Sequence, residues 1–378
     1  MRRNFKNLIA GIFNPPPDYF LSGLICFMVF AGLVFLSSAS SISSYKNYGG
    51  TYYLLLHQIT FGFLPGLFFF YLFFRLDYHV WKKWSLIILG VSLVLLLAVF
   101  LPKIGSSFGT ARSWINIFGI SFQPSEIVKF CLILYLAGWF SLKEKQELGH
   151  IGLSFVPFIS LLAFILTLVV LQPDIGTAII IVAIAMSLFF AAGGKLTHIG
   201  FICLGAALIF LLLILQAPYR LDRLTTFLNP DTDPYQTGYH INQAKIAVGS
   251  GGWLGRGLGK SIQKFSYLPE VTGDSIFAVI SEETGFIFSA LLILCYFLLM
   301  FKGLMLAKRT ADKFGQFLVV GIISWITFQA FINIAAIIGL APLTGVPLPF
   351  ISYGGTSLMS LMAASGLLLN ISKFNKQL

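Results

Sequence analysis

Long apolar stretches fill most of the chain, and short polar segments separate them. A typical stretch is roughly 18 to 25 residues long, the length at which an α-helix crosses a hydrocarbon core of about 30 Å. We therefore predict an all-α polytopic membrane protein with about ten transmembrane helices. The expected spans are 19–38, 52–74, 85–102, 125–141, 151–171, 175–192, 198–216, 275–301, 316–340 and 355–371.

The composition is that of a membrane-embedded chain. Hydrophobic residues make up 57% of the 378 residues and charged residues only 10%, whereas a soluble domain carries roughly 25% charged residues. Because helices that pack together in lipid form one bundle, we expect a single domain over residues 1–378. The first apolar run, 19–38, lacks a small-residue cleavage site and is interpreted as a retained helix.

The basic residues predict the orientation of the bundle. With a cytoplasmic N-terminus, the short outer loops contain only Lys46, Lys103 and Arg112, while most other Lys and Arg residues fall in inner segments. This distribution follows the positive-inside rule, which is most reliable for short loops. Ten crossings then place the C-terminus in the cytoplasm as well.

One long outer segment, 217–273, between the seventh and eighth spans, breaks this charge pattern. Its glycines permit tight turns and a close approach of the backbone to a ligand, and its many aromatic side chains indicate an ordered structure at the membrane interface. Two interpretations stay open: a solvated loop with balanced charges, or a groove for an anionic ligand such as a diphosphate. Its cations are Arg220, Arg223, Lys245, Arg256, Lys260 and Lys264.

Two sets of ionisable residues fall at membrane depth, where an unpaired charge is costly. Glu126 and Lys129 lie one helical turn apart and face the same way, either as a structural ion pair or as part of a cavity for a polar substrate. Asp174 follows Pro173 where an apolar run resumes, so it is either a helix N-cap or a site residue.

The start of the eighth span is the candidate for acid–base chemistry. Asp274 opens this span, where a helix cap would explain it, but capping does not explain Glu282 and Glu283 about two turns further on. Either the helix extends above the membrane here, or these carboxylates face a polar cavity. A carboxylate near the membrane surface and close to a basic loop is a candidate general base. Burial raises its pKa toward the working pH, and neighbouring cations oppose that shift.

The cysteines and histidines point to packing rather than to metal chemistry. The four cysteines lie inside apolar runs without any motif spacing and are interpreted as small packing residues. The five histidines are scattered along the chain, so we predict no zinc site.

Seven short motifs occur in order along this frame, and they resemble those of the shape, elongation, division and sporulation (SEDS) family. Members of this family are FtsW-like or RodA-like, and the resemblance covers nearly the whole chain. The runs 257–264 and 328–334 look more like the division branch, FtsW, than like RodA. The motifs are Ala111–Ile115, Phe122–Ile127, Gln172–Thr177, Tyr219–Arg223, Gly255–Lys264, Tyr267–Glu270 and Pro349–Ser357.

The resemblance implies a peptidoglycan glycosyltransferase in the bacterial cytoplasmic membrane. Such an enzyme polymerises lipid II, a disaccharide peptide carried on undecaprenyl diphosphate, at the outer face of the membrane. The catalytic aspartate proposed for the family falls on Asp274, which would deprotonate the acceptor sugar hydroxyl. The substrate-binding residues are then expected to be Arg112, Glu126, Lys129, Asp174, Arg220, Arg223, Lys260, Lys264 and Glu282.

The resemblance also implies cofactor and partner expectations. Basic side chains would stabilise the leaving diphosphate, and a divalent cation (Mg or Mn) could share that task, although no ligand set in the sequence demands one. The expected partners are lipid II, a class B penicillin-binding transpeptidase, other division or elongation proteins and membrane lipid. Nucleic acid is not among them.

The sequence departs from the family pattern next to the candidate base. The usual His-Thr-Asp reads Thr272-Gly273-Asp274 here, and the leucine of the usual Glu-Glu-Leu-Gly is Thr284. The alternatives are a RodA-like role in elongation, a flippase or other transporter of a lipid-linked cell-wall precursor, and a catalytically silent scaffold. An enzyme is favoured because Asp274, the basic loop and its glycine cluster belong to one face of the membrane. The cluster consists of Gly249, Gly251, Gly252, Gly255, Gly257 and Gly259.

Overall fold

The computed structural model describes residues 16–374, apart from 103–104, 109–110, 118–119, 145–146, 148–149, 216–224, 226 and 228–236. Within these residues, ten helical segments match the ten predicted spans, so the polytopic helical fold is confirmed. They are α2 (Tyr19–Tyr48), α3 (Tyr53–Gln58) continued by η1 (Ile59–Phe63) and α4 (Leu64–Arg75), α5 (Tyr78–Ala98), α6 (Pro124–Ser141), η2 (Ile151–Phe155) continued by α8 (Val156–Leu171), α9 (Ile175–Ala191), α10 (Leu196–Leu215), α13 (Ile276–Arg309), α14 (Lys313–Ile337) and α15 (Gly355–Phe374).

Length and hydropathy support membrane crossing by most of these segments. Six of them are long and apolar enough to cross a membrane by these criteria alone, and three more are shorter apolar helices. The remaining segment is α6, whose 18 residues include Glu126 and Lys129.

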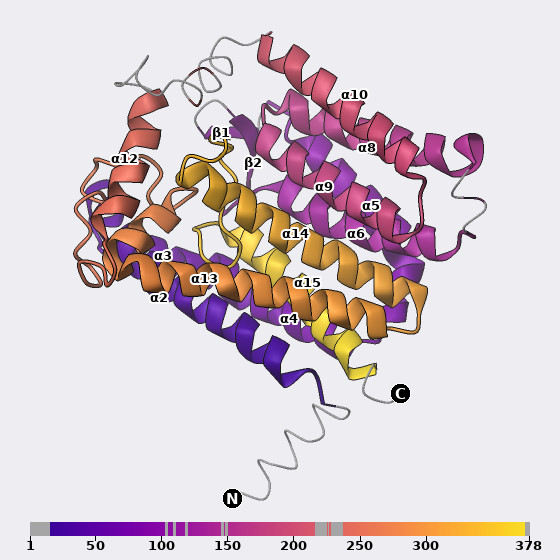
Figure 1. Ribbon diagram of the computed structural model, residues 1–378, viewed down its shortest axis with the longest axis horizontal. Coiled ribbons are helices and arrows are strands. Elements are labelled where there is room, and N and C mark those ends of the chain that lie inside the picture. Colours follow the sequence, from indigo (N-terminus) through magenta and orange to yellow (C-terminus); the bar gives the residue numbers. More distant parts are fainter. Residues whose placement is uncertain are drawn as a thin grey trace, which may run out of the picture.

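The helices lie side by side, roughly along the long axis of the molecule (Figure 1). The ends of the described chain meet at one end of the bundle, where the backbone N–H of Asp18, the N-cap of α2, donates to Ser372 Oγ in α15 (3.0 Å). An even number of crossings requires this arrangement. That this end faces the cytoplasm stays a prediction from the charge distribution.

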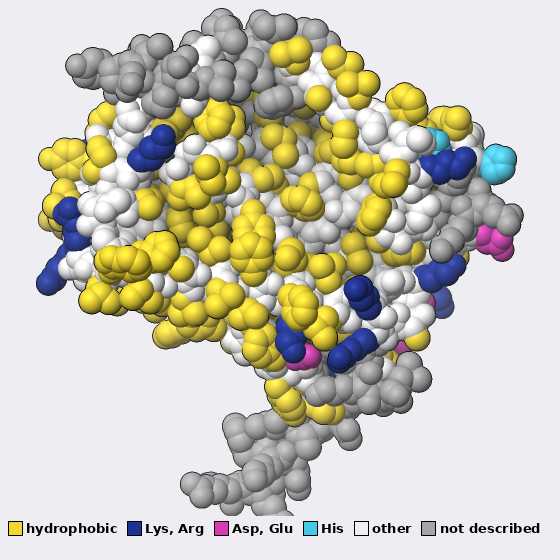
Figure 2. Space-filling view, in the orientation of Figure 1, with side chains coloured by type: hydrophobic (Ala, Val, Ile, Leu, Met, Phe, Trp, Pro, Cys, Tyr) yellow, Lys and Arg dark blue, Asp and Glu magenta, His cyan; other side chains and the backbone are white. Residues whose placement is uncertain are grey.

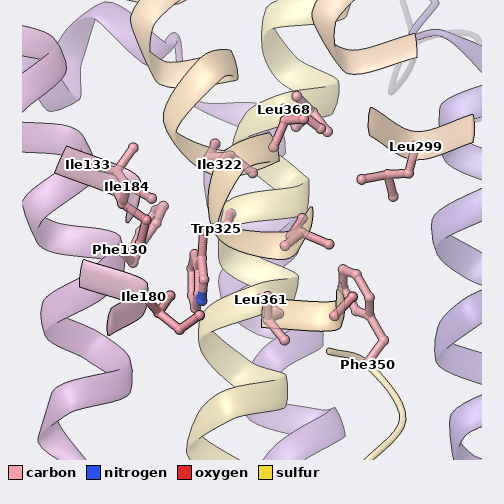
Figure 3. Close-up of a cluster of buried hydrophobic side chains, with 14 of the residues drawn as sticks. Phe130, Ile133, Ile180, Ile184, Leu299, Ile322, Trp325, Phe350, Leu361 and Leu368 are labelled. Atoms are coloured by element: carbon pink, nitrogen blue, oxygen red, sulfur yellow. The ribbon is translucent and has the colours of Figure 1, made fainter. Parts of the chain in front are cut away.

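The centre of the bundle is formed by α14 and α15 with α6 and α9 around them. Figure 3 shows side chains from these helices gathered around Trp325 of α14, which is fully buried. A helix that is apolar on all sides is expected in such a position. Small residues let α15 approach α4 closely: a Cβ at Gly366 would collide with the carbonyl oxygen of Phe70.

The outward faces of α4 and α5 carry large exposed apolar side chains, including Phe68, Leu86 and Val94. Figure 2 shows hydrophobic side chains over the middle of one face of the molecule, with Lys and Arg toward its edges. A soluble monomer rarely exposes so continuous an apolar surface. A bilayer covers such a surface and leaves the charged edges in water.

A three-stranded antiparallel sheet lies between α5 and α6, where the sequence indicated only an outer loop. Its strands are β1 (Gly105–Phe108), β2 (Ala111–Ile117) and β3 (Ile120–Phe122), in the order β1-β2-β3. Ile115 pairs with Gly105 on one side and with Phe122 on the other, and it is buried. A meander this short lacks a long alternating pattern, which explains why the sequence did not reveal it.

The described part of the long segment 217–273 includes the helix α12 (Thr237–Ser250). Ala244 and Ala247 of α12 are fully buried in the core that includes the first turns of α13. Figure 1 shows α12 and the turns after it at the end of the bundle opposite the chain termini. Of residues 217–236, only Thr225 and Phe227 are described.

Replacing Gly366 by valine should separate α15 from α4. The overpacked contact should lower the stability of the folded protein by about 1–3 kcal/mol, measured as a reduced melting temperature in detergent. Gly90→Val in α5 is the matched control, because a Cβ at Gly90 meets no atom within 4 Å. Equal melting temperatures for the two variants would contradict the close approach.

Candidate functional site

Asp274 lies just before α13 with a partly exposed side chain, and its turn is fixed through three consecutive backbone carbonyls. The carbonyl oxygen of Thr272 accepts from the backbone N–H of Tyr353 (2.8 Å), and that of Gly273 accepts from Ser352 Oγ (2.6 Å). The carbonyl oxygen of Asp274 accepts from Asn333 Nδ2 of α14 (2.8 Å). The turn is therefore anchored by parts of the chain about 60 to 80 residues away.

The segment 343–354 that supplies two of these donors is itself supported by α14. Pro347 and Pro349 cannot donate backbone hydrogen bonds, so this stretch cannot form a regular helix or an interior strand. Asn333 Nδ2 also donates to the carbonyl of Val346 (2.8 Å), and Gln329 Nε2 donates to that of Pro347 (2.9 Å). Two side-chain amides one turn apart on α14 thus donate hydrogen bonds to carbonyl groups of the irregular segment beside Asp274.

Three polar side chains lie around the Asp274 carboxylate. Ser275 Oγ lies 3.3 Å from Asp274 Oδ1 and 2.7 Å from His240 Nε2, which comes from α12. Glu270 closes the turn, since its carbonyl oxygen accepts from the backbone N–H groups of Gly273 (2.9 Å) and Ser275 (3.2 Å). Loss of water raises the pKa of the Glu270 carboxyl, and the Asp274 charge raises it further, while His240 opposes the shift.

A second polar group lies inside the bundle beneath the segment 343–354. Lys129, which is fully buried, donates to Glu126 Oε1 (2.7 Å) and to Gln329 Oε1 (2.8 Å), and it lies over the ring of Trp325. Among the residues that the structure describes, Glu126 Oε2 has no hydrogen-bond partner. Because Gln329 also contacts the segment next to Asp274, α14 connects this buried ion pair with the Asp274 turn.

Asp174 is the N-cap of α9, as the capping interpretation predicted. Its carboxylate accepts from the backbone N–H of Thr177 (3.0 Å), from Thr177 Oγ1 (2.8 Å) and from Gln123 Nε2 (3.0 Å). Gln123 precedes α6, so Asp174 connects the start of α9 to the start of the helix that carries Glu126 and Lys129.

The remaining predicted binding residues lie in different places. Lys260 is exposed, whereas Lys264 and Glu282 are buried and hold the loop after α12 against α13. Arg112 lies in β2, but its side chain lies outside the described part of the structure, and so do Arg220 and Arg223 entirely. The Asp274 turn and the Glu126–Lys129 pair are thus connected through side chains of α14, whereas Lys264 bonds to Glu283 and Ser38.

The described residues do not form a protein cage for a divalent cation. They contain no cluster of three or more His, Cys, Asp or Glu side chains that could hold a metal ion. The chemistry that the arrangement supports is proton transfer: a hydroxyl brought to the open side of Asp274 meets a carboxylate in a fixed backbone.

Sequence reasoning missed Asn333, Ser352, His240 and Glu270 as members of the site. The signal for Asn333 was present, because two amide side chains one turn apart in an apolar helix require polar partners. Ser352 had no such signal, since its partner is a backbone carbonyl far away in the sequence.

Comparisons with known proteins agree along nearly the full length. The family of FtsW, RodA and SpoVE, described as cell cycle proteins, matches residues 20–377. Stage V sporulation protein E of Bacillus subtilis is 37% identical over 360 residues, which cover 95% of this chain and 98% of that protein. A probable peptidoglycan glycosyltransferase FtsW of Trichlorobacter lovleyi is 39% identical over 346 residues, with 90% and 89% covered.

Two solved structures have the same fold. A chain of a peptidoglycan synthase complex that coordinates polymerization and crosslinking superposes with a TM-score of 0.78 at 25% identity, covering 96% of this chain and 99% of that one. RodA of Thermus thermophilus superposes with a TM-score of 0.66 at 25% identity, with 94% and 96% covered.

Removing the amide of Asn333 should loosen the Asp274 turn. In Asn333→Ala the carbonyls of Asp274 and Val346 lose their donor, which should lower stability by about 1–3 kcal/mol and speed hydrogen exchange across residues 270–276. Asn116→Ala, at an exposed position in β2, is the control. Unchanged exchange in Asn333→Ala would show that other contacts suffice to hold the turn.

Breaking the Glu126–Lys129 pair should be worse than removing both charges. Lys129→Met leaves a buried carboxylate without its cation, which costs about 3–5 kcal/mol, so folded yield and melting temperature should fall steeply. The double variant Lys129→Met/Glu126→Gln should recover much of that loss, with exposed Lys83→Met as control. Additive losses in the double variant would contradict a coupled pair.

Proposed function

Because the chain belongs to the FtsW/RodA/SpoVE family of cell cycle proteins, we propose that it is a peptidoglycan glycosyltransferase of the bacterial cytoplasmic membrane. It polymerises lipid II into glycan strands at the outer face of that membrane. The names of its relatives support this activity. The observation that carries the proposal is Asp274, a partly exposed carboxylate on a turn that three separate donors hold in place.

Asp274 acts as the general base in the proposed reaction. It takes the proton from the acceptor sugar hydroxyl while that oxygen forms a bond to the anomeric carbon of the donor. The bond from this carbon to the diphosphate breaks, and the diphosphate leaves with the electron pair. Cations of the outer loops, with Arg112, Arg220, Arg223 and Lys260 as the candidates, stabilise its charge.

The raised pKa of Glu270 suits this assignment. A neighbouring negative charge disfavours the ionised form of a carboxyl group and so raises its pKa. The Glu270 carboxyl is the one whose pKa is raised, with Asp274 among the causes. Glu270 therefore keeps its proton to higher pH than an ordinary glutamate, which limits the negative charge beside Asp274.

A role in division is favoured over one in elongation. Curated relatives of the chain include FtsW proteins and the sporulation protein SpoVE, and the runs 257–264 and 328–334 resemble the division branch. The similarity to RodA in fold is compatible with either branch. Transport of a lipid-linked precursor is the second candidate, because the buried pair of Glu126 and Lys129 is also what a membrane transporter would use.

The proposed partner is a class B penicillin-binding transpeptidase that crosslinks the new strand. The similar chain of known structure belongs to a peptidoglycan synthase complex that joins polymerization to crosslinking. Phe297 and Phe301 on α13 are exposed, and an apolar helix face of this kind can pack against a single transmembrane helix.

Asp274→Asn should abolish polymerisation without affecting membrane insertion. The amide keeps the size of the side chain but cannot take the hydroxyl proton, so the rate should fall by at least about 100-fold. Gel-resolved products from labelled lipid II, with and without the transpeptidase, measure this change. Asp77→Asn is the control, because Asp77 caps α5 at the other end of the bundle and asparagine caps equally well.

Two outcomes would count against the proposal. Strand synthesis by the Asp274→Asn variant would remove Asp274 from the role of base. No product from well-folded wild-type protein under any condition would favour transport, and a liposome assay of lipid II translocation would then decide.

A further inference from the structure

The helix α13 is interrupted at Gly285, and the loop after α12 supplies partners for the backbone groups that lose their helical hydrogen bonds there. Gly285 has φ 74° and ψ −173°, so the backbone leaves the helix at this residue. In an unbroken helix, the N–H groups of Phe286 and Ile287 would bond to the carbonyls of Glu282 and Glu283. The break removes both hydrogen bonds and leaves four polar backbone groups in need of partners.

The loop supplies all four partners. The N–H groups of Phe286 and Ile287 donate to the carbonyls of Gly252 (2.8 Å) and Trp253 (3.2 Å). The carbonyls of Glu282 and Glu283 accept from the N–H groups of Arg256 (3.0 Å) and Gly257 (2.9 Å).

The glycines of this loop are explained by the contact. A Cβ at Gly251 would collide with the carbonyl of Ser281, and one at Gly255 with the carbonyl of Glu283. Gly255 also has φ 78°, where a side chain is disfavoured. Gly251 and Gly255 therefore serve a backbone-to-backbone contact with α13.

A buried ion pair between Lys264 and Glu283 holds the loop against α13 next to the break. Lys264 Nζ donates to Glu283 Oε1 (2.9 Å), to the carbonyl of Gly259 (2.7 Å) and to Ser38 Oγ of α2 (3.1 Å). Ser38 Oγ in turn donates to the Glu283 carboxylate (2.7 Å). An ammonium group has three donors, so all of those on Lys264 are used within the protein.

The break lies where α13 changes from buried on all sides to exposed on one face. The residues from Ile276 to Glu283 are buried, whereas Phe286 and Ile287 are 61% and 55% exposed. At about 1.5 Å per residue, the 34 residues of α13 extend well beyond a core of about 30 Å. The break thus separates a part of α13 with one exposed apolar face from a protein-enclosed part that begins right after Asp274.

We propose that Lys264, Glu283 and Ser38 are a positioning unit that fixes the enclosed part of α13, and with it Asp274, on the membrane-spanning part. Lys264 then does not bind the diphosphate. The effect on catalysis rests on the proposed function. The effect on the position of the Asp274 turn rests on the contacts alone. Loosening the unit should displace the Asp274 turn and lower turnover while leaving substrate affinity unchanged.

The test is a double-mutant cycle on the ion pair. Lys264→Met and Glu283→Gln should each lower kcat for lipid II polymerisation by about tenfold or more, with KM within about threefold of wild type. The double variant should regain at least about threefold over Lys264→Met, because no buried charge is left unpaired. Exposed Lys46→Met, at the end of α2, is the control for loss of one positive charge on the same side.

Hydrogen exchange across residues 270–280 gives a second readout that does not need activity. Exchange should be faster in Lys264→Met and return toward the wild-type rate in the double variant. Ser38→Ala, which removes one hydroxyl and no charge, provides a milder variant if Lys264→Met fails to fold, and it should show a smaller change in the same direction.

Each outcome decides between the two roles of Lys264. A raised KM in Lys264→Met that Glu283→Gln does not rescue would make Lys264 a substrate ligand and overturn the proposal, as would unchanged exchange in Lys264→Met and Ser38→Ala. Inactive wild-type protein with the expected exchange pattern would refute the proposed function and leave the positioning unit standing.

Discussion

A backbone N–H or carbonyl group at membrane depth must find its partner inside the protein, because lipid offers none. Regular helices meet this requirement by themselves, and most of the bundle consists of them. The two places where the described chain departs from regular helix near Asp274 meet it with donors and acceptors from elsewhere. The break in α13 uses the backbone of the loop after α12, and the segment 343–354 uses the amides of Gln329 and Asn333.

Buried charged side chains must also find their partners inside the protein. Lys129 and Lys264 are both enclosed by protein, and each has a carboxylate partner and at least one further polar acceptor. A buried ion pair of this kind adds little net stability, yet losing one partner is costly. Such pairs therefore define which arrangement of elements is allowed. One pair sets α6 against α14, and the other sets the loop against α2 and α13.

Apolar length and charge bias were enough to predict the ten helical segments, because a bilayer imposes the same requirement on each crossing. The same patterns could not reveal the sheet β1–β3 or the helix α12, whose formation depends on local pairing and on packing against α13. Asp274 was found through a resemblance that its immediate neighbours only partly match. The partners that hold it, Asn333 and Ser352, were not found, since nothing in the local sequence relates them to a turn some 60 to 80 residues away.

The anchoring of the Asp274 turn through main-chain oxygens also bears on how this protein can change over evolutionary time. A carbonyl group is the same whatever side chain accompanies it, so positions 272 and 273 can drift in identity while the geometry of the turn is inherited unchanged. The side chains that determine the position of Asp274 belong instead to α14 and to the segment after it. Substitutions there, rather than beside the aspartate, are the ones that remove the hydrogen-bond donors of the turn.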